Sequence, residues 1–388
     1  MTKSSVTFTE LKESKQAGEY LGKQILSSSD NKSPDVVVVF ASSSYDYTLL
    51  LEAIKKTCHP ALLIGCSSAG EFVSNNQGEG AVSALAITSS EMQFSIGIGR
   101  DIQKGVKKVA IDIVSSFKGT NNFKYPYKSA LVLADALAGY TDHLIDELNT
   151  LTFGTYQFFG GGAGDDAKFS KTHVFFGTKA YTNAAVTLEI LSHKPLGIGV
   201  RHGWEAASKP MRVTESDGMR LVSLNAIPTV EVFKEHAKIT KQKFDLKGPI
   251  PFFLHNVIGI KTVNGYQLRV PLSINSDGSI ECASDIPRGA TVSIMKTTSQ
   301  SATQAAKDAL EDALLQMNGE KAGVALFFDC VATRLRTGDK FSSELNTLQK
   351  GLGSTQYVGC NTYGQIARVD GQFSGFHNCT AVVCVIPE

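Results

Sequence analysis

The sequence repeats one order of secondary structure three times, and this repeat restricts the chain to a fold assembled from similar units. Each copy begins with a short apolar run rich in β-branched or aliphatic residues, which is typical of a strand buried on both faces. A helical pattern, a second short strand, a glycine-bounded loop and further strands follow. The three apolar runs are Val36–Phe40, Ala130–Ala134 and Val324–Phe328, and the three loops span 65–72, 160–166 and 359–366.

Two kinds of detailed agreement support the repeat. The loops at 65–72 and 359–366 share the form G-C-[SN]-[ST]-x-G-[EQ]-[FI]. The first two copies both end in G-I-G-x-R or G-I-G-R, and the spacing from the apolar run to the loop is 29 residues in one and 30 in the other. The sequence therefore predicts an α/β (mixed α+β) fold, in which strand–helix–strand–glycine-loop–strand units form mixed sheets flanked by helices.

The pattern changes between the second and third copies. Residues 225–240 read as a helix, 241–251 as a linker, and 252–298 as antiparallel strands with Asn264-Gly265 and Asp277-Gly278 as hairpin turns. A helix with a capping box formed by Ser301 and Gln304 follows, and the helix of the third copy is expected to stop at Gly351. We expect three segments: an N-terminal helical extension at 1–34, a two-unit domain at 35–245, and a domain of antiparallel strands plus the third unit at 246–388.

Composition excludes several classes of protein. The 388 residues are 42% apolar and 19% charged, and 38 Lys+Arg residues against 37 Asp+Glu give a net charge of +1. Nucleic-acid binding requires a clustered basic excess, which this balance does not favour. The apolar runs are strand-sized, so membrane insertion is not expected, and the polar first residues contain no secretory signal. Seven cysteines, mostly in strand-like contexts, suit free thiols in a reducing cytoplasm.

Separated motifs carry a resemblance to a known family. In the first domain these are the loop at 65–71, the glycines before Asp165, and Arg201-His202-Gly203-Trp204; in the second they are the loop at 359–365 and His377-Asn378-Cys379-Thr380. Together they resemble FIST N and FIST C domains over roughly residues 35 to 386. Two positions depart from the family pattern, because Asn225 stands where an acidic residue is usual and Gln365 where glutamate is usual. A carboxylate role would then fall to Glu71 or Asp165.

The resemblance implies a bacterial, cytoplasmic sensor of a small ligand that signals to a partner in trans. One branch of similar length resembles the NosP haemoproteins, which bind haem b, sense nitric oxide and act on a histidine kinase. On this resemblance we expect haem b as cofactor, nitric oxide as signal, a histidine kinase or other signalling protein as partner, and possibly a homodimer. The alternative is a sensor for an amino acid or another small metabolite without haem.

The residues themselves indicate where a ligand could bind. Glycine-bounded turns place backbone N–H groups at the carboxyl edge of a sheet, where α/β proteins commonly bind ligands. The opposing interpretation is that the glycines only permit turns and the hydroxyls only satisfy turn backbones. The candidate pocket residues are Cys66, Ser67, Ser68, Glu71, Gly162, Asp165, Cys360, Asn361 and Thr362.

Histidines and cysteines supply the remaining candidates. Non-covalent haem needs an axial ligand and an apolar pocket, and the candidate ligands are His143, His202, His236, His255 and His377. No H-x-x-x-H pair occurs, so a zinc site is not expected, and we expect no metal other than haem iron and no catalytic residues. A thiol-dependent enzyme using Cys66 or Cys360 is a second alternative, although a space-filling role for both is the stronger expectation. An interaction scaffold without a ligand is a third.

Overall fold

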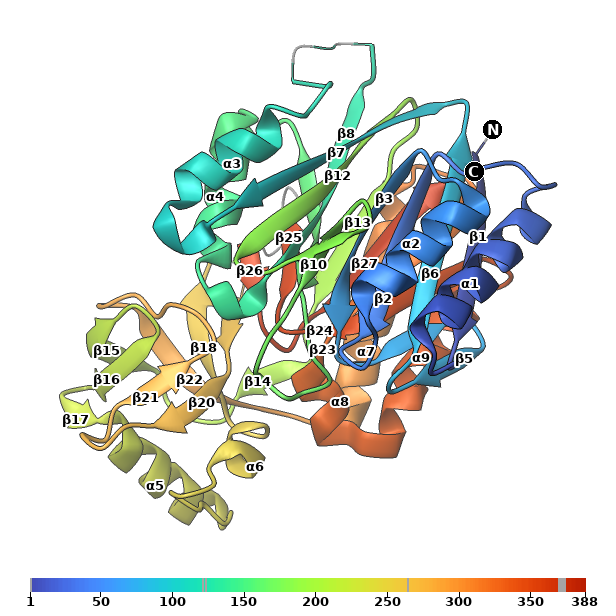
Figure 1. Ribbon diagram of the computed structural model, residues 1–388. Coiled ribbons are helices and arrows are strands. Elements are labelled where there is room, and N and C mark those ends of the chain that lie inside the picture. The colour runs from blue at the N-terminus through green and yellow to red at the C-terminus, as the bar shows by residue number, and fades with distance from the viewer. Residues whose placement is uncertain (1, 121, 123, 264, 369–374) are drawn as a thin grey trace.

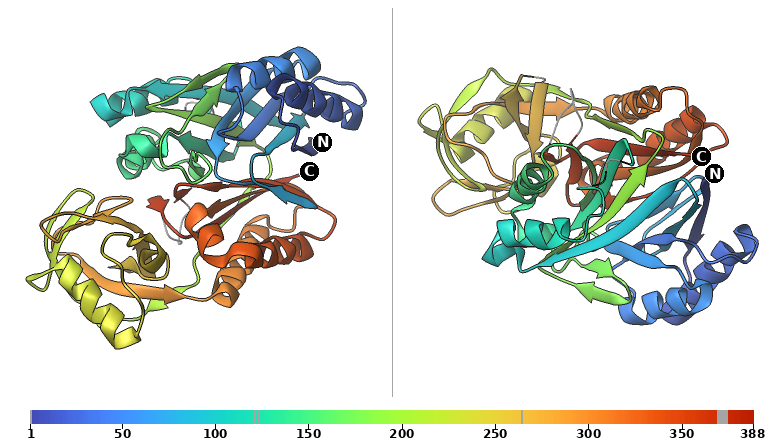
Figure 2. Two further views of the ribbon diagram at one scale, coloured as in Figure 1. Left: turned by 60° about the horizontal axis from the view of Figure 1, so that its bottom comes forward. Right: turned by 90° about the horizontal axis from the view of Figure 1, so that it is seen from above.

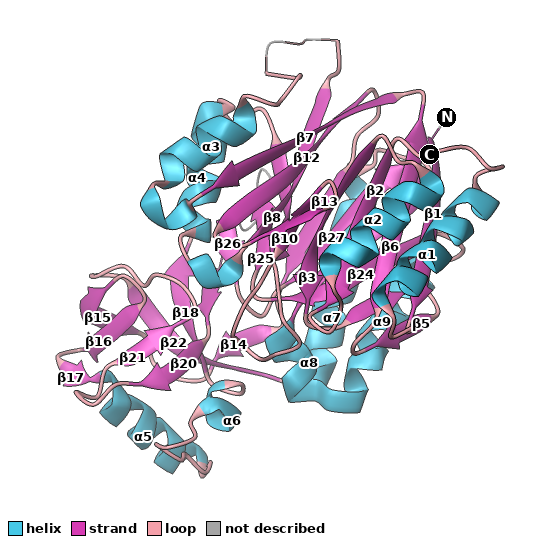
Figure 3. Ribbon diagram, viewed as in Figure 1, coloured by secondary structure: helices cyan, strands magenta, loops and turns pink. Residues whose placement is uncertain are grey.

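Three similar units surround a common centre, and a small β-rich module lies at one side (Figure 1). The computed structural model describes residues 2–120, 122, 124–263, 265–368 and 375–388. Within these ranges the strands form three six-stranded sheets and one nine-stranded sheet. Helices cover the outer faces of the three six-stranded sheets, as Figure 3 shows most clearly for α1 to α4. This agrees with the predicted mixed α/β fold.

Unit A begins at the N-terminus and contains the first copy of the repeat. Its two central strands run parallel, with Val36 opposite Leu62 and Ser42 opposite Ser68. Its first strand pairs antiparallel with its last. The elements are β1 (Thr2–Thr9), α1 (Ser14–Ser28), β2 (Val36–Ser42), α2 (Tyr47–Cys58), β3 (Leu62–Ser68), β4 (Glu71–Val73), β5 (Asn76–Gly78) and β6 (Val82–Ser89).

Unit B follows the same plan, with a parallel central pair and an antiparallel edge. Its elements are β7 (Met92–Arg100), η1 (Ile102–Lys104), α3 (Val106–Val114), β8 (Tyr127–Ala134), η2 (Ala136–Ala138), α4 (Thr141–Leu151), β9 (Gln157–Gly162), β10 (Val174–Phe176), β11 (Lys179–Tyr181) and β12 (Ala184–Ser192).

Unit C repeats the plan once more, but its first strand is separated from the remainder by the small module. Its elements are β13 (Gly197–Arg201), α7 (Ser299–Gln316), β23 (Ala322–Cys330), α8 (Val331–Thr337), η3 (Gly338–Lys340), α9 (Phe341–Leu352), β24 (Gln356–Thr362), β25 (Gln365–Arg368), β26 (Gly375–His377) and β27 (Ala381–Pro387). Figure 2 (right) shows the three units from above, around one centre.

Each unit contributes one hairpin to the sheet of a neighbouring unit, and the three exchanges form a closed cycle. The β4–β5 hairpin of unit A joins the sheet of unit C, β10–β11 of unit B joins the sheet of unit A, and β25–β26 of unit C joins the sheet of unit B. The three glycine-containing segments are therefore the places where the chain leaves one sheet and enters the next. This exchange holds the units together and brings the segments to a common point.

The small module interrupts unit C between β13 and α7. It packs α5 and the short helix α6 against antiparallel strands around Phe233, Phe253 and Ile258. Its elements are β14 (Trp204–Ala206), β15 (Met211–Asp217), β16 (Arg220–Leu224), β17 (Ile227–Pro228), α5 (Thr229–Thr240), α6 (Ile250–Phe253), β18 (Val257–Thr262), β19 (Gly265–Arg269), β20 (Pro271–Ile274), β21 (Ile280–Cys282) and β22 (Thr291–Thr297).

The central strands are buried on both faces, as their apolar runs predict. In β2, Val36, Val38 and Phe40 face the centre, where the inner faces of all three sheets meet. The alternate residues Val37 and Val39 face α1 and α2. The Phe40 ring packs edge-on against Phe328 of unit C at 5.7 Å between centroids. Burial of two apolar faces per sheet explains why these strands need no polar residues.

The glycines that open the predicted loops are strand residues. Residues 65–68, 160–162 and 359–362 lie within β3, β9 and β24, so the predicted loops begin later than expected. A Cβ at Gly65, Gly160 or Gly359 would lie 2.0, 2.1 or 1.9 Å from a carbonyl oxygen of the adjacent parallel strand. The repeated glycine therefore permits close approach of two backbones rather than a turn.

The N-terminal segment differs from its prediction. Residues 1–34 were expected to form a helical extension, but β1 is an edge strand of the six-stranded sheet of unit A and α1 packs on the same sheet. β1 and α1 therefore complete unit A, as β7 and α3 complete unit B. The predicted division at residue 245 lies inside the small module, between α5 and α6.

The other differences between the predicted and the observed elements lie at the ends of helices. α5 begins at Thr229, because Asn225 and Ala226 have φ of 50° and 62° and form a turn before Pro228. α9 runs through Gly351 and ends at the left-handed Gly353, with φ of 61°. The capping box of α7 is formed by Thr298 with Ser301, one turn earlier than predicted. Asn264 of the predicted Asn-Gly turn lies outside the described residues.

Candidate functional site

The three glycine-containing segments meet at the centre, where they bind one another through the main chain. Ala69 N donates to Asn361 O at 2.9 Å, and Gly162 N donates to Gly364 O at 2.9 Å. Gly164 N donates to Ser67 O at 2.9 Å, which closes the ring of contacts. We call this meeting point the loop junction. It confirms that the repeat brings the three segments together, and main-chain hydrogen bonds join them directly to one another.

All three units share one type of hydrogen bond. In each, the backbone N–H of the residue just before the last strand donates to a side-chain oxygen. In unit A, Ala81 N donates to Glu71 Oε2 at 3.0 Å, and Ser68 Oγ lies 2.5 Å from Glu71 Oε1. In unit C, Thr380 N donates to Gln365 Oε1 at 3.2 Å, and Gln365 Nε2 donates to Thr362 Oγ1 at 2.8 Å. In unit B the acceptor of Asn183 N is Asp135.

Gln365 of unit C therefore accepts the same backbone hydrogen bond that Glu71 accepts in unit A. Burial raises the pKa of Glu71 to about 8, against the partial lowering by its hydrogen bonds with Ser68 and Ala81. A protonated carboxyl and an amide both offer an acceptor oxygen and at least one donor, so Glu71 can make the same two contacts as Gln365 at neutral pH. Through these hydrogen bonds, Glu71 and Gln365 stabilise the loop junction.

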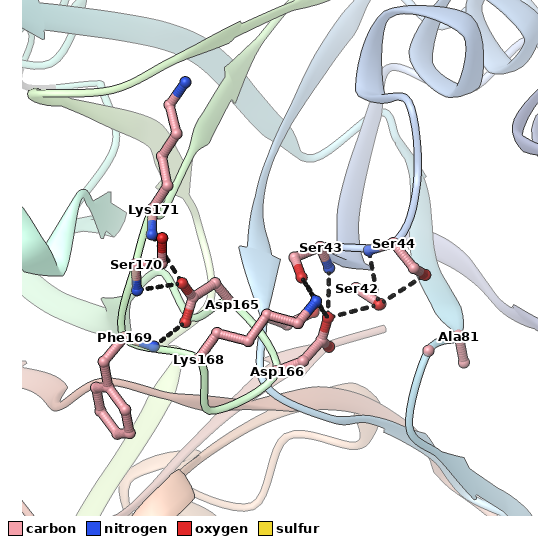
Figure 4. Close-up of polar contacts among 12 residues, drawn as sticks. Ser42, Ser43, Ser44, Ala81, Asp165, Asp166, Lys168, Phe169, Ser170 and Lys171 are labelled. Carbon is pink, nitrogen blue, oxygen red and sulfur yellow. Dashed lines mark hydrogen bonds and ion pairs between the residues drawn. The ribbon is translucent and has the colours of Figure 1, made fainter.

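An open cavity of about 460 Å³ lies beside the loop junction, at the carboxyl ends of β2 and β3. We call it the unit A cavity. The start of α2 forms one wall and the long connection from β9 to β10 forms the other (Figure 4). Its lining residues are Ser43, Tyr45, Asp46, Tyr47, Thr48, Asp165, Lys168, Ser170, Lys171, His173 and Ala180.

Asp165 shapes this cavity by organising the connection. Its carboxylate accepts N–H groups of Phe169, Ser170 and Lys171 at 2.9, 2.7 and 2.8 Å, and it also accepts the Tyr363 hydroxyl. Asp165 is 2% exposed, so its four donors satisfy it fully and leave no capacity for a ligand. The predicted pocket residue is therefore a support of the wall.

The neighbouring Asp166 ties the connection to unit A. It accepts Ser42 Oγ at 2.9 Å, Ser43 N at 2.9 Å and Ser43 Oγ at 2.5 Å, while Lys168 Nζ donates to Ser43 Oγ at 2.7 Å (Figure 4). These contacts hold Lys168 at the cavity wall.

Several groups at the unit A cavity remain available to a ligand. Tyr47 Oη and His173 Nδ1 are buried without a hydrogen-bond partner. Burial lowers the pKa of His173, so its ring is neutral at pH 7. Lys171 is exposed and makes no ion pair among the described residues, whereas Lys168 Nζ pairs with Asp166 Oδ2 at 3.5 Å. The cavity therefore presents the unpaired cation of Lys171, neutral polar groups and the carboxylate of Asp46 beside the first turn of α2.

Sequence reasoning did not select Lys168, Lys171, Tyr47 or His173. A length difference could have found the first two. Within a unit, the strand glycine is followed by a hairpin residue that pairs with the glycine of a neighbouring unit. These two residues are seven positions apart in units A and C, Gly65 to Phe72 and Gly359 to Ile366. In unit B, Gly160 to Phe175 spans fifteen. The extra residues are the ones that build the cavity wall.

Cys66 and Cys360 lie where a thiol enzyme would not place its nucleophile. All seven are buried, and Cys66 and Cys360 are fully buried in the core between the three sheets. Burial and the adjacent Cys66 raise the pKa of Cys360. A nucleophilic thiolate needs an accessible site that lowers its pKa, so both thiols fit the space-filling role.

Three of the candidate haem ligands are engaged inside the structure. His202 Nε2 contacts Tyr266 O at 2.9 Å and His236 Nε2 contacts Asn256 Oδ1 at 3.1 Å. His377 is 2% exposed, and burial lowers its pKa to about 4, with a further lowering by Arg269. His143 lies 3.5 Å from Asp285 in a polar cavity of about 570 Å³ beside α4. His255 lines a different cavity of about 550 Å³.

Comparisons with known proteins identify the chain by its domains. A family model described as the FIST N domain matches residues 35–227, and one described as the FIST C domain matches residues 230–368. No curated protein matches the sequence. The described part of the chain contains no helix long and apolar enough to cross a membrane.

Two solved structures show weak similarity. A crystal structure of cyanuric acid hydrolase from A. caulinodans shares 7% identity at a TM-score of 0.33, over 99% of each chain. T. maritima PurL complexed with FGAR shares 9% identity at a TM-score of 0.22, over 98% of this chain and 72% of that one. At these TM-scores only the domain matches bear on function.

Proposed function

The chain belongs to the FIST family, and on that premise we propose that it is a sensor whose small ligand binds in the unit A cavity. FIST domains generally sense ligands in signalling. The observation that carries the proposal is the cavity itself, which is open and borders the loop junction where all three units meet. A ligand there contacts unit A and the connection from unit B together, so its binding changes how two units fit.

The chemistry of the walls favours a small polar metabolite with a carboxylate or phosphate. Lys171 supplies positive charge that no ion pair engages, Lys168 lies beside it in its ion pair with Asp166, and the first turn of α2 adds the positive end of a helix dipole. Asp46 at the rim supplies the opposite charge, which suits an amino acid or a related compound. Tyr47 Oη and His173 Nδ1 are free to form hydrogen bonds with it.

A thermal-shift screen against amino acids, small carboxylates and phosphorylated metabolites tests this proposal. We expect a ligand that raises the melting temperature, and at least tenfold weaker binding by the Lys168→Ala/Lys171→Ala variant. Lys107→Ala on α3, which removes an exposed lysine remote from the cavity, is the matched control. A ligand that binds both variants equally would place its site elsewhere.

We propose that the output passes in trans to a signalling protein such as a histidine kinase, as the family resemblance implies. Ligand binding would alter the contact between the two proteins. The measurement is the autophosphorylation rate of a candidate kinase with the sensor, with and without ligand. An unchanged rate in every combination would contradict a kinase partner.

Haem b with nitric oxide as its signal is the second candidate, and one observation favours it. Among the five candidate histidines, His255 borders a cavity that Phe252 also lines, and the Phe252 ring is held by stacking on Phe244 at 4.4 Å between centroids. Burial lowers the pKa of His255, as does the charge of Arg336, so the ring is neutral as ligation requires. His255 would hold the iron, Phe252 would pack on the porphyrin, and Lys243 would pair with a propionate.

When bound, haem would supply an iron centre that coordinates nitric oxide. The absorbance spectrum of haem-reconstituted protein tests this candidate. We expect a Soret band that shifts with nitric oxide and is lost in His255→Ala, while His143→Ala, which changes the histidine of the polar cavity, retains it. A spectrum of free haem in the wild type would eliminate it.

A further inference from the structure

The edges of two sheets meet at one corner of the molecule. β1 is an edge strand of the unit A sheet, and β5 is an edge strand of the unit C sheet. Gly78 of β5 adjoins β1, since a Cβ there would lie 3.2 Å from the Phe8 ring. A cavity of about 230 Å³ opens between these strands and α1, which lie together at the right of Figure 1. We call it the corner groove.

Amide side chains dominate the polar lining of the corner groove. They come from Gln24 of α1, Asn75 and Asn76 of the β4–β5 hairpin, and Gln356 of β24. Within the described part of the chain, none of these side chains forms a hydrogen bond, and no charged side chain lines the groove. The unit A cavity, by contrast, is lined by both lysines and aspartates. The two cavities therefore suit ligands of different charge.

The remaining lining offers apolar surface and one buried hydroxyl. Val6, Phe8 and Val73 supply the apolar surface, and the Tyr20 ring, which is 41% exposed on α1, lies beside them. Thr7 is 8% exposed, and its Oγ1 has no hydrogen-bond partner among the described residues. Buried polar atoms are nearly always paired in native proteins, so this hydroxyl indicates a partner from outside the chain.

The free edge of β1 adds main-chain groups to the corner groove. β1 pairs with β6 on one side and has no strand on the other among the described residues. Every second residue of an edge strand directs its N–H and C=O away from the sheet. The successive residues 6–8 all line the groove, so the groove follows this edge. It therefore offers donors and acceptors of both main-chain and side-chain origin.

This lining matches an uncharged ligand that is rich in hydroxyl groups. An amide both donates and accepts hydrogen bonds, as a hydroxyl does, so the two groups are matched in both roles. A charged ligand would lose water here without meeting an opposite charge. An aromatic ring beside apolar side chains presents a surface on which the C–H face of a sugar ring can pack.

From this arrangement we propose that the corner groove is a binding site for an uncharged saccharide, separate from the unit A cavity. The Tyr20 ring packs on the C–H face of the sugar. The amides of Gln24 and Gln356 bind its hydroxyls, and Thr7 Oγ1 binds the hydroxyl that lies deepest. Because α1 belongs to unit A and β24 to unit C, the bound saccharide bridges the two units.

Calorimetry on the whole protein measures the binding of glucose, galactose, mannose and N-acetylglucosamine, with glucuronate and glucose 6-phosphate as charged counterparts. We expect at least one neutral sugar to bind. The charged counterparts should bind at least tenfold more weakly, because the groove supplies no opposite charge. Acetylated and amidated dialanine tests for a peptide, the other ligand that a strand edge can take. No binding of any neutral sugar, or tighter binding of the dipeptide than of every sugar, would overturn the proposal.

Substitutions on the exposed face of α1 locate the site. Tyr20→Ala removes the ring and Gln24→Ala removes one amide, and alanine favours the helix in both variants. We expect at least tenfold weaker sugar binding by Tyr20→Ala and about three- to tenfold weaker binding by Gln24→Ala. Gln16→Ala, on the same helix but outside the groove, is the matched control and should bind the sugar unchanged. Equal binding by the wild type and Tyr20→Ala would contradict the proposal.

The Lys168→Ala/Lys171→Ala variant separates the corner groove from the unit A cavity. It should bind the sugar as the wild type does, whereas Tyr20→Ala should retain any ligand of the unit A cavity. A sugar that is lost by the lysine variant and kept by a folded Tyr20→Ala variant belongs to the unit A cavity, and the corner groove proposal then fails. Thermal unfolding of each variant establishes that it is folded.

Discussion

Units A and C are built from the same elements, yet their carboxyl edges differ in cover and in pairing. In unit A the edge is open, and Asp165 is satisfied by N–H and hydroxyl groups, whereas Asp166 uses only its Oδ2 and keeps Oδ1 without a partner. In unit C the edge is covered by α8, and both polar side-chain atoms of Asn361 have no hydrogen-bond partner. The comparison shows that the repeat supplies the same sheet and helices in both units. The segment that lies over the carboxyl edge of the sheet differs between them, and it decides which ligands the edge can bind.

The largest expected effect comes from breaking the scaffold that both units share. Gly359→Val would place a side chain 1.9 Å from the Phe327 carbonyl oxygen. Strands that cannot approach lose their pairing, so we expect a loss of more than about 3 kcal/mol of unfolding free energy. Urea unfolding measures it. Gly105→Ala, where an added Cβ meets nothing within 4 Å, should change stability little; equal losses would refute the close-approach argument.

A second substitution disrupts only the wall of the unit A cavity. Asp165→Ala removes the acceptor of three N–H groups and of the Tyr363 hydroxyl. Charged hydrogen bonds of this kind contribute about 1.5–3 kcal/mol each, with incomplete additivity, so we expect a loss of about 3 kcal/mol. Ligand binding in the unit A cavity should also be lost. Full retention of binding would show that the wall does not depend on Asp165.

The pH dependence of the unfolding free energy tests whether Glu71 and Gln365 are equivalent. Burial raises the pKa of Glu71 from 4.5 to about 8, so the folded protein holds a proton that the unfolded chain has released. Its contribution to stability is therefore present below pH 4.5 and declines as pH rises towards 8, by up to about 1.4 kcal/mol per pH unit.

Glu71→Gln should remove that decline. We expect the variant and the wild type to unfold at similar urea concentrations at pH 4.5, and the variant to be about 1–3 kcal/mol more stable at pH 8. The wild-type protein is its own control across the pH series. A variant that is less stable at pH 8 would mean that Glu71 is ionised in the folded protein.

The smallest effect on stability is expected at the edge of the α8 cover. Glu79 is 78% exposed in its ion pair with Arg334, so Glu79→Gln should cost less than about 0.5 kcal/mol. The same change should increase hydrogen exchange in residues 331–337, because it releases the edge of α8. Exchange that is unchanged there would show that the ion pair does not hold the cover closed.

The sequence alone determined the repeat and the burial of its strands. The apolar runs of β2, β8 and β23 predicted strands with two buried faces, because burial leaves a local pattern of residue types. The glycines at 65, 160 and 359 marked where backbones approach, although turns were expected there. The meeting of the three segments followed from equivalent positions in equivalent units. The family resemblance followed from motifs spread along the whole chain.

Only the tertiary structure decided which strands pair and which polar groups are satisfied. The exchange of hairpins between units, and the place of β1 in unit A, depend on backbone N–H and C=O groups that are chemically alike in every strand. The roles of Asp165 and Glu71 depended on donors from distant segments, such as Tyr363 and Ala81. The cover over Asn361 is likewise a matter of packing, because a residue's type does not record what lies above it.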